Sequence, residues 1–498
     1  MGKLARQASL NFVLTYMGLL LGFINTAILY PRILPDDHFG LTRLLVSIAT
    51  MAGAFAQLGL DNTIVRYFPY FRNPSTKNNG LLTLVLVIAF AGSLIAMLFL
   101  GAFHPWVARI FGGENGLYAV YGLFSLPLVL SEVFFLVLRG YSRSLQRSVK
   151  PTFLREFVLR ALQTGLIGAQ AYWQFPLSLF IALFTATFLI CTIWLFIDLT
   201  IQGERLVPWK QVRVPQRLRS SMVRFSAYTV AASIASVVLG SMDQLMIGAL
   251  LGSASLTQVG YYAVAFNFGA IVSAPMRALG QLGIPLLAEA WKHKDLSAIQ
   301  RLYTRSVSTQ FTIAGYLFLL LWVDLRDLFT FLRPEFGVAF SSALIISASS
   351  LLNMAVGLNA GIITMSRNFR FDSASSLLLL VSNAILNWFL IRWLGISGAA
   401  WSTLVSLIMV LIVRVWFLWS RFRLWPYSRK TVIIPLIVLV IGLPLLEAPM
   451  SGIPWLDILL RGVIVTVVYW SMMFWLKIAP DLSERAIAIL RGHTSRQR

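Results

Sequence analysis

Long apolar runs alternate with short polar segments along the whole chain, and positive charge gathers in every second polar segment. Each run holds about 20 residues, the length at which an α-helix crosses a hydrocarbon layer of about 30 Å. Hydrophobic residues make up 58% of the sequence and charged residues 12%, with a mean hydropathy of +0.77. This pattern predicts an all-α polytopic membrane protein with about fourteen transmembrane helices.

The expected spans follow one another at short intervals between residues 9 and 476. They cover residues 9–30, 41–60, 80–103, 117–138, 152–172, 176–199, 222–250, 258–285, 306–323, 340–365, 373–391, 397–418, 431–447 and 458–476. The first span has no small-residue cleavage pattern and leads directly into the second, so we expect it to be a retained helix rather than a removable signal.

The basic residues set the expected orientation. If the amino terminus is cytoplasmic, the inner segments hold 31 of the 41 lysines and arginines, and the outer segments hold five: Arg32, Arg109, Arg326, Arg333 and Arg392. Short cytoplasmic loops are enriched in Lys and Arg. We therefore expect a multi-pass protein of the plasma (inner) membrane with both termini in the cytoplasm. The net charge of +22 then points to anionic lipid headgroups, and not to nucleic acid, as the partner of the basic loops.

An internal repeat divides the chain. RILPDDHFG (32–40) precedes one apolar run, and MDQLMIGALLG (242–252) with VGYYAVAFNFG (259–269) stands at the equivalent place at an offset of about 220 residues, so that Gly40 and Gly260 each open the next helix. The repeat predicts two pseudo-symmetric six-helix lobes, 1–202 and 221–420, with a basic linker at 203–220 and a C-terminal helix pair and tail at 421–498. Two lobes in parallel orientation are typical of transporters that bind substrate between them and alternate access.

Several motifs resemble one known family. The segment LNWFLIRWLGISGAAWSTLVSL (386–407) is similar to a signature of polysaccharide-type flippases in the multidrug/oligosaccharidyl-lipid/polysaccharide superfamily, and RILPDDHFG (32–40) and QLGLDNTIVRYFP (57–69) resemble two further motifs. The extra helix pair after residue 420 suits polysaccharide flippases better than twelve-helix multidrug exporters. The chain departs from the family at Pro35, at Trp401 and at Gln244, where an arginine is frequent after the aspartate.

The resemblance implies a function. A protein of this kind translocates a lipid-linked oligosaccharide of the undecaprenyl-pyrophosphate type by alternating access for surface polysaccharide synthesis, with membrane lipids, polysaccharide assembly proteins and H⁺ or Na⁺ as further partners. Within transport, a peptidoglycan-precursor flippase or a multidrug/cation antiporter remains open. From another class, a membrane glycan polymerase or ligase is the alternative, but the expected outer segments are mostly short and offer no domain to hold an acceptor.

Ionisable residues inside the expected spans are the candidate functional groups, because a charge in hydrocarbon is costly and usually faces a partner or a wet cavity. Arginine matches phosphate oxygens with two parallel N–H groups, so the candidates for substrate binding are Arg277, Arg43 and, at the cytoplasmic margin of a span, Arg66. Pro275 interrupts helix hydrogen bonding just before Arg277, which makes that arginine the first choice. Asp243, Glu132 and Asp61 are candidates for ion coupling or charge balance. We expect structural roles for Arg414 and for Arg160, which follows Glu156 by one helical turn.

Catalytic and metal sites are not supported by the sequence. The four histidines lie outside the spans or at their edges, and Cys191 is the single cysteine, so we expect no metal site and no disulfide. No phosphate-binding loop or dinucleotide motif is present. We therefore expect a protein that is not an enzyme, has no catalytic residues and carries no cofactor.

The topology can be tested with reporter fusions. Because basic residues are so unevenly divided, a fusion at Arg498 should report a cytoplasmic location, and fusions at Ala254 and Ser451 should report an external one. A cytoplasmic signal at Ala254 would overturn both the orientation and the parallel repeat.

Overall fold

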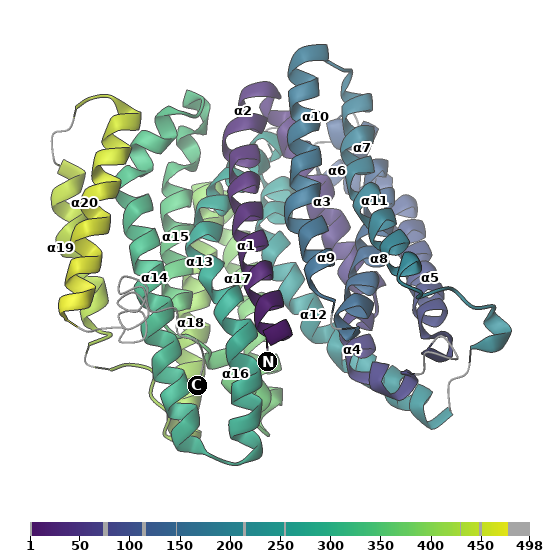
Figure 1. Ribbon diagram of the computed structural model, residues 1–498. Coiled ribbons are helices and arrows are strands. Elements are labelled where there is room, and N and C mark those ends of the chain that lie inside the picture. Colours follow the sequence, from purple (N-terminus) through teal and green to yellow (C-terminus); the bar gives the residue numbers. More distant parts are fainter. Residues whose placement is uncertain are drawn as a thin grey trace. The chain divides into compact units, whose positions relative to one another are not determined.

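A computed structural model describes residues 2–72, 78–111, 116–145, 147–212, 216–252, 255–428, 430–447 and 451–476 (Figure 1). All secondary structure in these ranges is helical. A chain that crosses a bilayer must satisfy its backbone hydrogen bonds internally, and a helix does so within one segment. Helical segments coincide with every expected span.

The helices of the first part of the chain are short, broken or π-helical at several places. They are α1 (Gly2–Phe23), η1 (Ile24–Leu29), α2 (Tyr30–Ile33), α3 (Asp36–Ala56), α4 (Leu60–Phe71), η3 (Asn78–Gly80), α5 (Leu81–Ala102), α6 (His104–Ile110), α7 (Leu117–Tyr121), η4 (Gly122–Phe124), α8 (Ser125–Ser144), α9 (Val149–Thr152), η5 (Phe153–Val158), α10 (Leu159–Trp173) and α11 (Leu177–Ile201).

The helices of the second part are mostly longer. They are η6 (Trp209–Gln211), α12 (Gln216–Leu250), α13 (Ser255–Lys292), α14 (Leu296–Thr330), η8 (Pro334–Ala339), α15 (Phe340–Met354), α16 (Asn359–Met365), α17 (Phe369–Leu394), α18 (Ile396–Phe422), α19 (Ile433–Glu447) and α20 (Pro454–Trp475).

Ten helical stretches among the described residues are long and apolar enough to cross a membrane, and Ile433–Glu447 is a shorter apolar helix. The protein is therefore an all-α multi-pass membrane protein, as the sequence predicts. The number of fourteen spans is compatible with these helices and stays a prediction.

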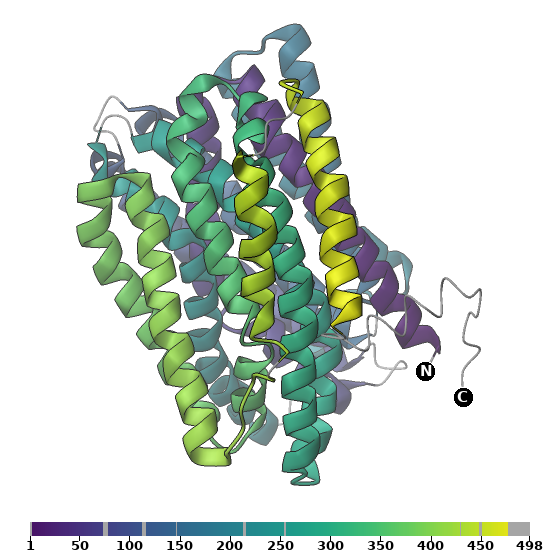
Figure 2. The same ribbon diagram turned by 90° about the vertical axis from the view of Figure 1, so that its left-hand side faces the viewer.

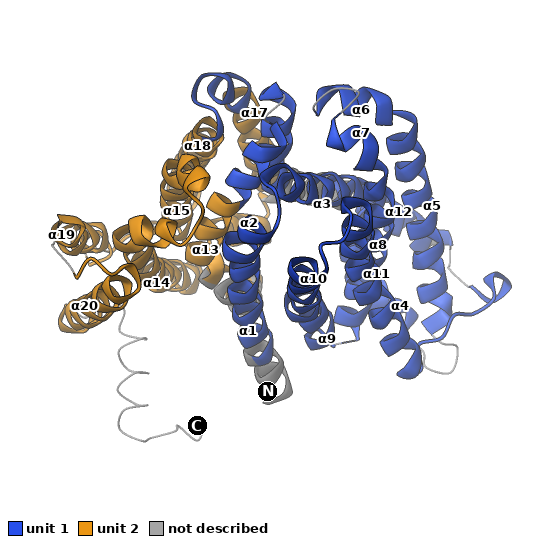
Figure 3. Cartoon of the chain, turned by 90° about the horizontal axis from the view of Figure 1, so that it is seen from above, with its two compact units in different colours: residues 1–263, 387–396 blue, residues 264–386, 397–498 orange. Residues whose placement is uncertain are grey.

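The described chain divides into two compact units (Figure 3). Unit 1 comprises residues 1–263 and 387–396, and unit 2 comprises 264–386 and 397–498. Helices α13 and α17, and α18 through its first residue Ile396, therefore contribute residues to both units. The lobes expected from the repeat have other boundaries, which stay a prediction.

Each unit has its own apolar core. In unit 1, Phe39, Leu44, Val129 and Phe184 are almost fully buried. In unit 2, α19 and α20 lie against α14 (Figure 2), and Leu319, Ile434 and Tyr469 are buried in one cluster that joins these three helices.

Local backbone conformation separates α3 from α4, at the end of the second expected span. Leu58 and Gly59 both adopt left-handed backbone conformations, with φ of 51° and 70°, and separate α3 from α4. Glycine tolerates this region because it lacks a Cβ atom.

The beginning of α14 is capped by Asp295, whose carboxylate accepts hydrogen bonds from the Ala298 amide and the Ser297 hydroxyl. Both hydrogen bonds hold the pKa of Asp295 below its usual value, and the bond from Ser297 has the larger effect.

Gly40 and Gly260, the two residues related by the sequence repeat, lie together in unit 1. A Cβ atom on Gly40 would come within 1.6 Å of the Leu256 carbonyl oxygen, and one on Gly260 would lie 2.9 Å from the Phe39 ring and 3.4 Å from the Gly40 nitrogen. Glycine thus lets the beginnings of α3 and α13 approach at backbone distance, as small residues do between membrane helices.

Gly40→Ala should therefore destabilise the protein, by about 1–3 kcal/mol or more, because the new methyl group meets backbone that cannot move aside as a side chain would. Thermal unfolding of detergent-purified protein would measure the loss. Gly165→Ala is the matched control, since a Cβ atom there meets nothing within 4 Å. Equal unfolding temperatures for the two variants would contradict the close crossing.

Candidate functional site

Arg43 lies on α3 in unit 1, partly buried and surrounded by aromatic rings. Its guanidinium carbon is 4.9 Å from the centre of the Tyr30 ring and 5.1 Å from that of Phe39, and its Nη2 donates to the Thr26 hydroxyl at 3.2 Å. Its Nε is buried without a hydrogen-bond partner, and no carboxylate among the described residues pairs with it. Aromatic faces stabilise a cation and leave its N–H groups able to bind an anion.

The first helix is widened beside Arg43. Residues Ile24–Leu29 form the π-helix η1, and Phe153–Val158 form a second one, η5, which lies against α1. Asn25 of η1 donates to the Arg160 carbonyl oxygen at 2.9 Å, and Thr164 donates to Asn25 at 2.8 Å. Single turns of π-helix often occur at functional sites, and here one such turn places Thr26 under the Arg43 guanidinium.

Arg66 lies elsewhere. It is exposed on α4, with its guanidinium carbon 4.3 Å from the centre of the Phe225 ring and 5.8 Å from that of Tyr67. The described contacts of Arg66 and Arg43 have no residue in common, and the expected roles of both arginines at the substrate stay predictions.

Arg277, the first choice from the sequence, belongs to α13, but its side chain lies outside the described residues, as does that of Pro275. Its role as a substrate ligand stays a prediction.

Asp243 on α12 is a buried carboxylate, 6% exposed. The Tyr262 hydroxyl donates to its Oδ2 at 2.5 Å, and the Asn387 amide donates to its Oδ1 at 2.8 Å. Three separate segments of unit 1 therefore meet at one carboxylate. The neighbouring Gln244 accepts a hydrogen bond from the Ser47 hydroxyl of α3 at 2.6 Å. At the position where the family often has an arginine, this chain therefore has a glutamine that connects α12 to α3.

Glu132 and Asp61 both form ion pairs. Glu132 of α8 accepts from Arg155 of η5 at 2.8 Å, and Asp61 of α4 accepts from Arg139 at 2.9 Å and lies 3.3 Å from Arg143. Paired carboxylates of this kind neutralise neighbouring arginines. Of the two roles expected for them, these contacts support charge balance.

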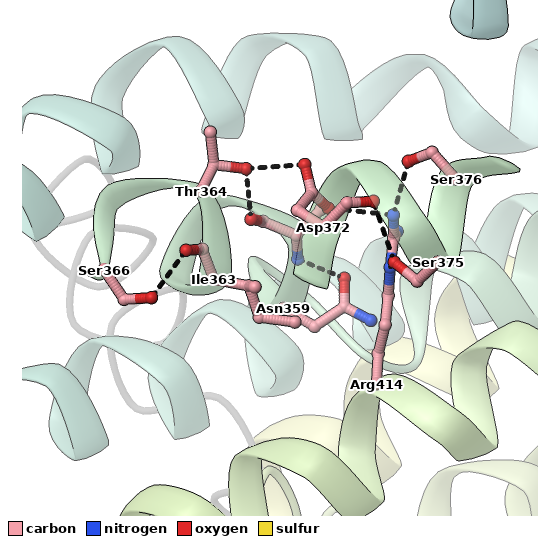
Figure 4. A network of polar contacts seen from close by, with 9 residues as sticks. Asn359, Ile363, Thr364, Ser366, Asp372, Ser375, Ser376 and Arg414 are labelled. Atoms are coloured by element: carbon pink, nitrogen blue, oxygen red, sulfur yellow. Dashed lines mark hydrogen bonds and ion pairs between the residues drawn. The ribbon is translucent and has the colours of Figure 1, made fainter. Parts of the chain in front are cut away.

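Arg160 and Arg414 have the structural contacts that the sequence predicted. Arg160 pairs with Glu156 at 3.2 Å, which confirms the predicted pair. In unit 2, Arg414 of α18 points toward α17, where it binds Asp372 at 2.8 Å and the hydroxyl groups of Ser375 and Ser376 at 2.9 Å (Figure 4). The protein itself thus supplies partners for the Nε and Nη2 atoms of this guanidinium.

Comparison with known families identifies the chain. The family model described as "Polysaccharide biosynthesis protein" matches residues 4–291, more than half of the sequence. The chain belongs to this family. The resemblance noted in its motifs is thereby confirmed. No curated protein matches it in sequence.

Solved structures show the fold of this family member. An inward closed structure of the lipid II flippase MurJ covers 93% of the chain and 98% of its own length, with a TM-score of 0.67 and 13% identity. An inward-facing multidrug resistance MATE transporter of the MOP superfamily covers 84% of the chain and 98% of its own length, with a TM-score of 0.65 and 13% identity. The chain therefore has the fold of the MOP superfamily, whose members named here are transporters and flippases.

Two groups of polar contacts in this polysaccharide-family protein are not predicted by the sequence. Arg461 of α20 pairs with Asp327 and lies 3.7 Å from Asp324, both on α14. The expected span ended at residue 323, one residue before the first aspartate, whereas α14 continues to Thr330. Asn387 belongs to the LN motif that carried the resemblance, and a polar residue inside an expected span was the available signal.

In the described part of the chain, no three histidine, cysteine, aspartate or glutamate side chains lie close enough together to hold a metal ion. Cys191 is buried and lies 3.6 Å from the Leu154 carbonyl oxygen, as a hydrogen-bond donor.

Proposed function

We propose that this protein is a flippase that moves a lipid-linked oligosaccharide of the undecaprenyl-pyrophosphate type from the inner to the outer leaflet of the plasma membrane, for surface polysaccharide synthesis. The family match and the transporter fold support movement of a lipid-linked glycan. The proposed finer steps are recognition of the pyrophosphate by arginine and alternating access of the two lobes.

The observation that carries the proposal is the state of Arg43. Arg160, Arg414 and Arg461 are described arginines inside helices that have carboxylate partners, whereas the partly buried Arg43 is held by two aromatic rings and a hydroxyl. A membrane protein seldom retains an unpaired cation in a span without a functional reason. A phosphate oxygen is a suitable partner for the N–H groups that Arg43 leaves free, because arginine binds phosphate through parallel hydrogen bonds.

Asp243 is our candidate for ion coupling. Burying a carboxylate is costly, and here two donors from different segments offset part of that cost. Binding of H⁺ or Na⁺ would neutralise the charge and change the contacts with Tyr262 and Asn387. Because these residues belong to α13 and α17, such a change would alter how three helices are held together, which is what a coupled transport cycle requires.

The proposal also includes partners and an orientation. Polysaccharide assembly proteins are the partners that such a substrate implies, and both termini are expected in the cytoplasm because of the distribution of basic residues. The structural similarity to MurJ makes a peptidoglycan precursor the second candidate substrate, and it shares the lipid pyrophosphate that Arg43 would bind.

Arg43→Ala should reduce glycan export by roughly tenfold or more while protein abundance stays near normal, since a cation–phosphate contact is lost but no carboxylate is left unpaired. Arg43→Lys should restore export in part, because an ammonium keeps the charge and loses the paired geometry. Surface glycan and membrane abundance would be measured in cells that depend on this protein.

Arg326→Ala, at an exposed position on α14, is the matched control and should export normally. Arg277→Ala should behave like Arg43→Ala if both arginines touch the substrate. Normal export by Arg43→Ala at normal abundance would refute the proposed role of Arg43.

Asp243→Asn should remove the dependence of transport on an ion gradient while substrate binding persists, because the amide keeps the shape but cannot ionise. Uptake of labelled substrate into vesicles, with and without imposed H⁺ and Na⁺ gradients, would measure this. Glu335→Gln, at an exposed site, is the control. If Asp243→Asn responds to the gradients as the wild type does, Asp243 is not the coupling group.

A further inference from the structure

The same short motif follows the sixth expected helix of each predicted lobe. After α11 the chain reads RLVPW (205–209), and after α18 it reads RLWPY (423–427). Both have the pattern Arg-Leu-X-Pro-aromatic. Their spacing agrees with the internal repeat of about 220 residues. The same motif at equivalent helix ends suggests that both copies have the same function.

The backbone of the third motif residue is held in the same way in both copies. In unit 1 the Val207 amide donates to the Thr83 hydroxyl at 2.9 Å, and this hydroxyl donates to the Val207 carbonyl oxygen at 3.1 Å. In unit 2 the Trp425 amide donates to Gln300 Oε1 at 3.0 Å, and Gln300 Nε2 donates to the Trp425 carbonyl oxygen at 2.7 Å. One polar side chain thus satisfies both backbone groups, at the beginning of α5 and of α14.

A cavity adjoins each motif. The one in unit 1 has a volume of about 600 Å³ and lies between α4, α5 and α12, with Trp209 of the motif, Val223 and Leu58 in its wall. The one in unit 2 has a volume of about 400 Å³ and lies between α15 and α18, with Trp425 and Tyr427 of the motif in its wall. Leucine, isoleucine, valine and tryptophan dominate both linings, and many of these side chains are exposed.

Each cavity also has an arginine next to it. Arg219 lines the cavity of unit 1. In unit 2, the guanidinium carbon of Arg423 lies 5.4 Å from the ring centre of Trp419, a lining residue. Arg423 takes a left-handed conformation, with φ of 58°, directly after α18, where glycine is the usual residue. An arginine in this strained conformation places its cation over the ring of Trp419, which lines the cavity.

We propose that each of these two cavities binds one anionic phospholipid of the leaflet that we expect to be cytoplasmic. The apolar wall would take an acyl chain, the tryptophan and tyrosine side chains would lie at the interface, and Arg219 or Arg423 would bind the phosphate. Aromatic side chains prefer the interface, and basic residues there attract anionic lipids. This inference is independent of the proposed flippase activity.

The test uses the full-length protein purified in detergent and native mass spectrometry after addition of phosphatidylglycerol or phosphatidylcholine. We expect up to two phosphatidylglycerol molecules to remain bound where phosphatidylcholine does not. Arg219→Gln and Arg423→Gln should each weaken binding of one lipid by roughly fivefold, the effect of one basic residue near an anionic headgroup.

Filling the cavities gives a second set of variants. Val223 and Ile412 line the two cavities and are 63% and 64% exposed, so tryptophan at either position should be tolerated by the fold. Val223→Trp and Ile412→Trp should each remove one bound lipid without changing the unfolding temperature. Ile193→Trp, at an exposed position on α11 outside both cavities, should bind as the wild type does.

Three results would overturn the proposal. Equal retention of the two phospholipids would show that the arginines do not select the headgroup. Unchanged phosphatidylglycerol binding in both tryptophan variants would place the lipids elsewhere. Retention of undecaprenyl phosphate, but not of phosphatidylglycerol, at these cavities would identify a prenyl chain as the occupant instead.

Discussion

A charge inside hydrocarbon costs several kcal/mol unless a partner or water stabilises it, and this cost accounts for the ion pairs between the helices that the structure describes. Glu132, Asp61, Asp372 and the α14 aspartates each have an arginine partner on another helical segment, so the pairs also hold neighbouring segments together. Arg43 departs from this pattern, and our proposal for substrate binding rests on that difference. Its aromatic surroundings stabilise the cation without neutralising it, which keeps the charge available for an anionic ligand.

The features that follow from chain-local rules were predictable from the sequence. Hydrophobic length gives the spans, because every backbone group in a bilayer needs an internal partner. The spacing of Glu156 and Arg160 gives their ion pair, because residues four apart share a helix face. The repeat singled out Gly40 and Gly260 as equivalent residues, and the structure shows that they meet at one close crossing.

The features that depend on distant contacts were not predictable. Nothing local tells which donors meet Asp243, and its partners Tyr262 and Asn387 come from other helices. Arg461 lies inside an expected span, but its pairing could not be read from the sequence because both aspartate partners lie beyond the end of another expected span. Arg43 and Arg66 were grouped because both were expected on or beside the second helix of the first lobe, but their aromatic neighbours differ: Tyr30 and Phe39 for Arg43, Tyr67 and Phe225 for Arg66.

The most direct test of the flippase assignment is a reconstitution assay. Purified protein would be placed in sealed vesicles with an undecaprenyl-pyrophosphate-linked oligosaccharide, and the glycan exposed on the opposite leaflet would be measured over time with a membrane-impermeant reagent. Our account predicts that the protein accelerates this movement well above that of protein-free vesicles, and that an excess of undecaprenyl pyrophosphate competes with it. Movement no faster than in protein-free vesicles, with an intact and correctly inserted protein, would contradict the assignment.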